Sequence, residues 1–194
     1  MKNPIHNLAP SDLIVALDPG LKHTGIAIGT RERLISLTTA SITHTAEAEL
    51  PSVMASGLLA FANAFIHREA IQAVVLEDYA INAPRFNIYQ AELVGIIKYL
   101  FWHTHKIPVY SLPQSVSKAL AGGGGKATKA SSYKALLPIM PPIRYLRDWA
   151  SITAPTSPGN LRFHASDAAA VHVGFSRYLA QDKITDSFHR RSLT

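Results

Sequence analysis

Two acidic residues in this sequence stand directly after short apolar segments. Asp18 follows Leu13 to Leu17, and Glu77 follows Ala73 to Leu76. Both segments have the length and composition of buried β-strands, so each carboxylate is displayed where a strand ends. Ligands of open α/β sheets gather at the carboxyl ends of parallel strands. We therefore expect Asp18 and Glu77 to share one rim of a sheet if their strands lie side by side.

A histidine and a third acid open the last apolar segment, HASDAAAVHVGFSRYL. His164 and Asp167 are three residues apart, a spacing that places both on one face of a helix. Three carboxylates that converge with a histidine form an oxygen-rich site suited to hard divalent cations, above all Mg²⁺, with Mn²⁺ as a substitute. Two such ions about 4 Å apart can activate a water and stabilise the leaving oxygen of a phosphodiester. The chemistry indicated is metal-assisted phosphodiester hydrolysis.

Each of these residues also has a purely structural interpretation. Asp18 precedes a Pro-Gly pair and fits the turn of a hairpin. His164 and Asp167 fit the N-terminal cap and first turn of a helix, where the positive end of the dipole favours an acid. Asp78 adjoins Glu77, but successive residues of a regular strand point to opposite faces, so only one of the two can face the site. We assign Glu77.

The composition is that of a well-cored, basic chain without cysteine. Its 194 residues make about one domain, with 47% hydrophobic and 16% charged residues. A net charge of +6 fits a polyanionic partner such as nucleic acid. The lack of cysteine removes disulfides and thiolate chemistry, and no apolar stretch reaches the roughly 20 residues of a membrane span. With no secretory signal visible, we expect an intracellular protein, in the cytoplasm of a bacterial or phage-infected cell.

Hydrophobic periodicity predicts a single α/β domain over residues 1–194, with a mixed sheet whose first strands form a hairpin and whose later strands are parallel. The predicted strands are 13–17, 24–29, 33–40, 73–76 and 107–111, and the predicted helices are 51–68, 87–103, 113–120, 126–137 and 164–181. The remaining segments are expected to be a lead-in at 1–11, a glycine loop at 121–125, a Pro-rich irregular insertion at 138–161 and a tail at 182–194.

The order of the motifs resembles one known family. The chain resembles the RuvC-type Holliday junction resolvases of the ribonuclease H-like superfamily. The resemblance rests on a strand followed by Asp-Pro-Gly-x-x-x-Thr-Gly from Asp18, on the strand-end Glu77, and on His-x-x-Asp-Ala from His164 on the final helix. The resemblance implies a ribonuclease H-like fold with a five-stranded mixed sheet flanked by helices. It also implies an endonuclease of DNA recombination and repair that resolves four-way junctions, with Asp18, Glu77, His164 and Asp167 as catalytic ligands of two Mg²⁺ ions.

The same resemblance implies residues that contact DNA. Lys118 and Lys129 fall where the family has junction-contacting lysines. The family usually carries an aromatic residue a few positions beyond the strand-end glutamate. Here that register offers Ala80, with Tyr79 and Phe86 nearby as substitutes.

Resolving a four-way junction takes two nicks, and one subunit with one site offers one. We therefore expect a two-fold symmetric homodimer, whose two sites would match the symmetry of the DNA. The resemblance places the interface on the apolar, aromatic helix predicted at 87–103.

Other functions remain as alternatives. A broader branched-DNA nuclease, or a nuclease of structured RNA from the same superfamily, would use the same acids. An actin-like or sugar-kinase ATP-binding protein opens with a similar hairpin but needs two domains, and 194 residues hold one. A catalytically dead DNA-binding module is disfavoured by the complete set of acids. The run AGGGGK lacks the G-x-x-x-x-G-K-[ST] spacing of a P-loop.

Overall fold

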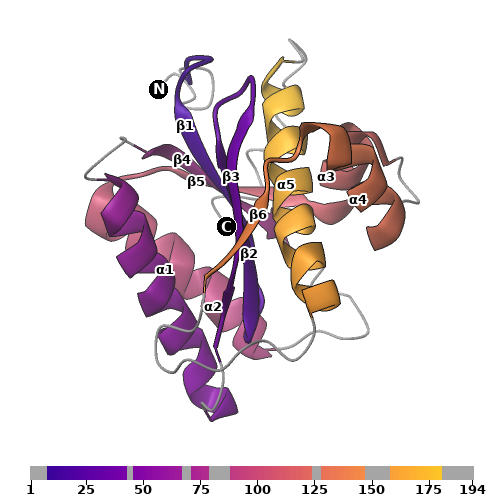
Figure 1. The fold of residues 1–194 in the computed structure, drawn as a ribbon. Helices are drawn as coiled ribbons and strands as arrows, with labels where there is room; N and C mark the ends of the chain where they lie inside the picture. Colours follow the sequence, from indigo (N-terminus) through magenta and orange to yellow (C-terminus); the bar gives the residue numbers. More distant parts are fainter. Residues whose placement is uncertain are drawn as a thin grey trace.

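The computed structural model describes residues 8–42, 46–66, 71–78, 88–123, 128–146 and 158–180. They form one six-stranded sheet with helices on both faces (Figure 1). The strands are β1 (Leu13–Asp18), β2 (His23–Gly29), β3 (Leu34–Ser41), β4 (Ile71–Asp78), β5 (Val109–Pro113) and β6 (Ile143–Leu146). The α-helices are α1 (Leu50–Ile66), α2 (Ile88–Tyr99), α3 (Gln114–Lys118), α4 (Lys129–Leu136) and α5 (Pro158–Ala180). Shorter helical turns are η2 (Glu47–Glu49), η3 (Leu100–Thr104), η4 (Ala119–Gly123) and η5 (Leu137–Ile139).

The sheet is mixed, with the strand order β5-β4-β1-β2-β3-β6. β2 is antiparallel to β1 and β3, whereas β4 is parallel to β1 and β5, and β6 is parallel to β3. β1 and β4 lie inside the sheet and are covered on both faces, which explains why their sequences are almost continuously apolar. Pro113 ends the edge strand β5, where a missing N–H costs no ladder hydrogen bond.

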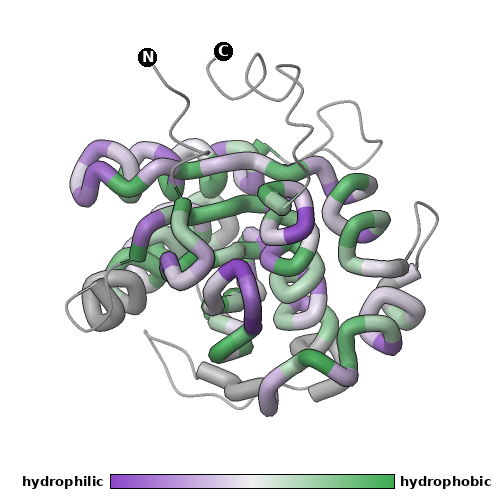
Figure 2. Tube along the Cα trace, turned by 90° about the horizontal axis from the view of Figure 1, so that it is seen from above, coloured by the Kyte–Doolittle hydropathy of each residue, from purple (hydrophilic) through white to green (hydrophobic). Residues whose placement is uncertain are grey.

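Alternate residues of the central strands belong to two different cores. The core against α1 and α2 includes Val15, Leu17, Val74 and Leu76. The core against α5 includes Ile14, Ala16, Ala73 and Val75. Figure 1 shows α1 and α2 on one side of the sheet and α3, α4 and α5 on the other. In Figure 2 hydrophobic and hydrophilic residues alternate along the helices, as expected when each helix has one face on the sheet.

Helix α5 lies directly on β2, and two glycines permit this approach. A Cβ atom at Gly25 would collide with the backbone carbonyl of His164, and one at Gly29 would collide with the ring of His172. The four-residue step along β2 covers about 13 Å and the eight-residue step along α5 about 12 Å, so the two elements stay in register between the contacts. The small, buried side chains of Ala165, Ala168 and Ala169 complete the close packing.

The five predicted strands are confirmed, with shifts at their ends; β4 in particular extends through Glu77 and Asp78. The segment 138–161, expected to be irregular throughout, differs from the prediction. It contributes β6, which pairs with Leu37 to Ala40 of β3 at the sheet edge, and the first turn of α5, which begins at Pro158. A four-residue edge strand among prolines has too short a pattern to be recognised. Pro158 suits the first position of a helix, but Gly159 and Asn160 that follow it are weak helix formers, so the first turn of α5 was not recognised.

Several predicted features lie wholly or partly outside the described residues. They are the first part of the lead-in, the last two residues of the glycine loop, the middle of the Pro-rich segment and the tail at 182–194. The described part of the predicted loop, 121–123, instead forms the end of the helical turn η4, which is kinked at Gly122 where φ is 101°. In the part of the chain that the structure describes, none of the helices combines the length and the apolar character that crossing a bilayer requires.

Candidate active site

The strand alternation aims Asp18 and Glu77 at the same face of the sheet. Asp18 continues the series Ile14 and Ala16, and Glu77 continues the series Ala73 and Val75, all of which face α5. Leu17 pairs with Leu76 in the parallel ladder, so the two acids are the next residues of adjacent strands. The shared rim predicted for these two carboxylates is therefore present.

The turn after Asp18 is fixed by hydrogen bonds at both ends. The Thr24 hydroxyl donates to the Gly20 carbonyl at 3.0 Å and accepts from the Gly20 N–H at 3.2 Å. From α2, the Gln90 side chain donates to the Pro19 carbonyl at 3.1 Å. These contacts explain the Asp-Pro-Gly-x-x-x-Thr pattern: threonine closes the turn that holds the acid at the strand end.

His164 reaches Asp18 because the same residue of β2 contacts both of them. Asp18 is paired with Gly25 in the β1–β2 ladder, and Gly25 is the residue on which the backbone of His164 rests. The result is a contact of 3.1 Å between His164 Nδ1 and Asp18 Oδ2. Asp18 therefore has a partner beyond its own turn, which a purely turn-forming aspartate would not need.

Asp167 lies one helical turn beyond His164 and is only 1% exposed. The alternative of a helix cap for His164 and Asp167 is wrong, because α5 starts six residues before His164, at Pro158. Both side chains stand inside the helix. A buried carboxylate at such a position is costly unless other groups or a cation stabilise it.

Glu77 is the most electrostatically perturbed acid of the site. Burial raises its pKa to about 9, helped by the negative charge of Asp18, a side-chain hydrogen bond with Asp18 and the charge of Asp167, while Lys118 opposes the shift. Glu77 is thus protonated at neutral pH without a cation, and a proton joins two carboxyl groups that would otherwise repel each other. Lys118, on α3, lies close enough to lower the pKa of this carboxyl against the larger effect of burial.

Two neighbours of the site were not predicted from the sequence. Gln114, the first residue of α3, donates from Nε2 to Glu77 Oε2 at 3.3 Å. His23, at the start of β2, has its ring centroid 5.7 Å from that of His164, and its Nδ1 lies 2.9 Å from Ser41 Oγ. The signal for Gln114 was its place directly after the third parallel strand. His23 had none, since its position depends on the register between β2 and β3.

The remaining predicted residues are placed only in part. Asp78 follows Glu77 in β4, where alternation turns it toward the opposite face, in agreement with the choice of Glu77. Lys129 is the first residue of α4, after the capping residue Thr128, but its side chain lies outside the described part of the structure. Tyr79, Ala80 and Phe86 also lie outside the described residues.

The donor set suits Mg²⁺, because it consists of three carboxylates and one imidazole with few softer ligands nearby. Within the described residues, however, no three acidic or histidine side chains are already grouped as ligands of one ion. Instead they contact in pairs, with Asp18 shared between His164 and Glu77.

Comparison with known proteins identifies the fold. No protein-family model and no curated protein sequence matches this chain. Thermus thermophilus RuvC superposes with a TM-score of 0.59 at 18% identity, covering 87% of this chain and 96% of that one. The same RuvC in complex with a Holliday junction substrate gives a TM-score of 0.60 at 18% identity, covering 86% and 94%. The yeast mitochondrial Holliday junction resolvase Ydc2 gives 0.56 at 15% identity, covering 92% and 83%.

These similarities span nearly the whole of both chains although few residues are identical, so the shared property is the fold. The mixed sheet with helices on both faces is the one that the sequence motifs predicted. This chain has the ribonuclease H-like fold of the RuvC-type Holliday junction resolvases.

Proposed function

We propose that this protein is a structure-selective endonuclease that resolves four-way DNA junctions by Mg²⁺-dependent phosphodiester hydrolysis. The observation that carries the proposal is the convergence of Asp18, Glu77, His164 and Asp167 at one end of a sheet with the resolvase fold. The chain's net charge of +6 contrasts with this local group of acids. Such a contrast suits a protein that attracts a polyanion and cuts it at a cation-dependent site.

The four residues have distinct roles in this proposal. Mg²⁺ bound here would supply an activated water and would stabilise the leaving oxygen. Asp18 would be the central ligand, because it contacts His164 and shares a side-chain hydrogen bond with Glu77. Glu77 would hold a cation as the carboxylate, and the hydrogen bond that Gln114 donates to its Oε2 orients that group. Lys118 and Lys129 would contact phosphates rather than bases, with Tyr79 and Phe86 as further DNA contacts.

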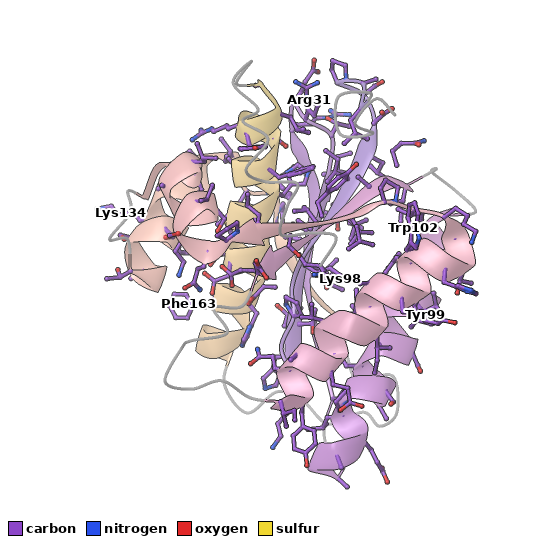
Figure 3. The ribbon with its side chains drawn as sticks, turned by 180° about the vertical axis from the view of Figure 1, so that it is seen from behind. Arg31, Lys98, Tyr99, Trp102, Lys134 and Phe163 are labelled. Atoms are coloured by element: carbon purple, nitrogen blue, oxygen red, sulfur yellow. The ribbon has the colours of Figure 1, made fainter. Side chains whose placement is uncertain are left out.

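Two nicks in strands of like polarity are best made by two sites, so we include a homodimer in the proposal. Its interface would be the outer face of α2 and the turn after it, where Ile88, Tyr99 and Trp102 are exposed. Figure 3 shows Tyr99 and Trp102 on the outside of this segment, and Lys98 directly precedes Tyr99 in the sequence. Sedimentation with and without junction DNA tests it, and a monomer under both conditions would contradict it.

The decisive experiment compares a four-way junction, a matched duplex and a structured RNA, each with Mg²⁺, Mn²⁺ or EDTA. Symmetric nicking of the junction with either metal and no cutting in EDTA is expected. Cutting of flaps or three-way junctions at equal rates would support the broader branched-DNA nuclease, and preferential RNA cutting would support an RNA nuclease. ATP binding in place of any cutting would favour the kinase-like alternative, although the resolvase fold already accounts for 87% of the chain.

A further inference from the structure

An aromatic pair stands beside the candidate active site. Phe163 immediately precedes His164 on α5, and its ring centroid lies 6.2 Å from that of Tyr133 on α4, with the rings at 79°. Both side chains are only partly buried, in contrast to Phe175 further along the same helix, which is fully buried in the core. In Figure 3 Phe163 projects from α5 at the same edge of the molecule as Lys134 of α4.

The geometry places Phe163 at the rim of the site. On a helix, residues four apart lie on one face, so Phe163 is one turn from the buried Asp167 and nearer to solvent. Its main chain is fixed, because the Ser166 hydroxyl donates to the Phe163 carbonyl at 3.0 Å. The edge-on contact with Tyr133 restrains the ring further. A rigid, half-exposed aromatic ring is therefore held next to a residue of the reacting centre.

We propose that Phe163, supported by Tyr133, is a stacking platform for a nucleobase next to the phosphate that is cut. The inference rests on the proposed nuclease function and adds the residue that would hold the unstacked nucleotide. Base-aromatic stacking is sequence-tolerant, since every base presents a π-face, and it occurs where bases are unpaired, as at a branch point. The charges agree with this occupant: Lys118 lies near Glu77, Lys134 is exposed on α4, and the chain carries +6.

The test is a set of matched substitutions. Phe163→Leu keeps an apolar side chain of similar reach but removes the π-face, and Phe163→Tyr keeps the π-face. Binding is measured by anisotropy in Ca²⁺, without cutting, on a junction that carries 2-aminopurine next to the scissile phosphate. We expect the parent and Phe163→Tyr to quench 2-aminopurine and to bind alike. Phe163→Leu should bind about tenfold more weakly and quench less, because stacking on one base contributes roughly 1–3 kcal/mol.

Three results would overturn the proposal: equal affinity and quenching for Phe163→Leu and the parent, equal losses for the Leu and Tyr variants, or a loss explained by a lower melting temperature of Phe163→Leu. The proposed function is judged separately. If the parent cuts the junction while Phe163→Leu matches it in binding, the function stands and the stacking platform fails. If the parent quenches 2-aminopurine through Phe163 without cutting any substrate, the platform stands and the nuclease fails.

Discussion

Helix α5 contacts β2 at two places, and at each a histidine of the helix lies on a glycine of the strand. The two histidines differ in exposure and in their polar neighbours. At one, His164 rests on Gly25; at the other, eight residues on, His172 rests on Gly29. The side chain of His164 is 26% exposed and contacts Asp18, whereas His172 is 1% exposed and has no ring nitrogen in hydrogen-bonding geometry with a described group. Burial lowers the pKa of His172 to about 4, against a smaller opposing effect of the Gly29 backbone.

The difference lies in the strands beneath the helix. Near His164, β1 and β4 end in Asp18 and Glu77; near His172, apolar residues such as Ile14 and Leu37 form the surroundings on the same face. A histidine on a glycine is thus only a packing arrangement. It becomes part of a candidate site where strand ends bring carboxylates to it. The following predictions change one place and use the other as its control.

The largest effect is expected from Asp18→Asn. Asp18 is the residue shared by His164 and Glu77, so its neutral isostere should lower junction cutting by at least about 10³-fold while junction binding persists. In thermal unfolding, Mg²⁺ should raise the melting temperature of the parent but not of the variant, because only a folded form that binds the ion is stabilised by it. Retained cutting by Asp18→Asn would rule out the metal-site interpretation.

Replacing His164 and replacing His172 should have different effects on cutting and on stability. His164→Ala should reduce cutting by about 10²-fold or more with little change in stability, since it removes a partner of Asp18 from a half-exposed position. His172→Leu should leave cutting unchanged and hold or raise the free energy of unfolding, because an apolar group replaces a buried imidazole of similar volume. Cutting rates and denaturant unfolding are measured for both variants. Equal losses of activity would contradict the assignment of His164 to the candidate site and of His172 to the core.

The glycines test the packing that the two places share. Gly25→Ala and Gly29→Ala each introduce a Cβ against a backbone carbonyl, of His164 and Arg33 respectively, and each should cost about 1–3 kcal/mol of unfolding free energy. Only Gly25→Ala should also weaken Mg²⁺ binding, measured by calorimetry, because it displaces His164 from Asp18. If Gly29→Ala weakens Mg²⁺ binding to the same degree, α5 moves as a rigid body and the two contacts are not independent.

The smallest effects, taken per pH unit, are changes in the free energy of unfolding with pH, measured in EDTA. The raised pKa of Glu77, about 9, means that the folded state holds a proton that the unfolded chain releases near pH 4.5, so stability falls as pH rises between these values. The lowered pKa of His172, about 4, means the reverse between pH 4 and 6.5: the unfolded chain binds the extra proton, and stability is lost as pH falls. Each slope is at most about 1.4 kcal/mol per pH unit.

Between pH 4.5 and 6.5 the two groups change the free energy of unfolding in opposite directions. Above pH 6.5 only the loss of stability caused by Glu77 remains. Glu77→Gln should remove that decline, and His172→Leu should remove the acid-side loss while leaving the decline in place. Urea unfolding at several pH values distinguishes them. A decline above pH 6.5 that survives in Glu77→Gln would have to come from another group.

The acids of the site could be predicted because each follows a short-range rule. Asp18 and Glu77 follow buried strands, and His164 and Asp167 share a helix face, so local pattern and chain order were sufficient. Gln114 was missed although it directly follows the third parallel strand, because its proximity to Glu77 also requires the register of Asp78 against Pro113. His23 was missed because its position depends on the register of β2 against β3, which no local pattern encodes. The strand β6 was missed for a related reason, since four edge residues become a strand only by pairing with β3.

The contact between Asp18 and His164 joins residues 146 positions apart in the chain. The candidate site can therefore form only late in synthesis. During synthesis β1 and β2 leave the ribosome early, and β4, which ends at Asp78 of the 194 residues, completes the pair of acidic strand ends well before the middle of the chain. Helix α3 then brings Gln114 to Glu77, but Asp18 gains its contact with His164 only when α5 has been made and has docked on Gly25. A nascent chain therefore carries two acids of the candidate site from the addition of Glu77 until that of His164, and α5, the last helix along the described chain, completes the group of four.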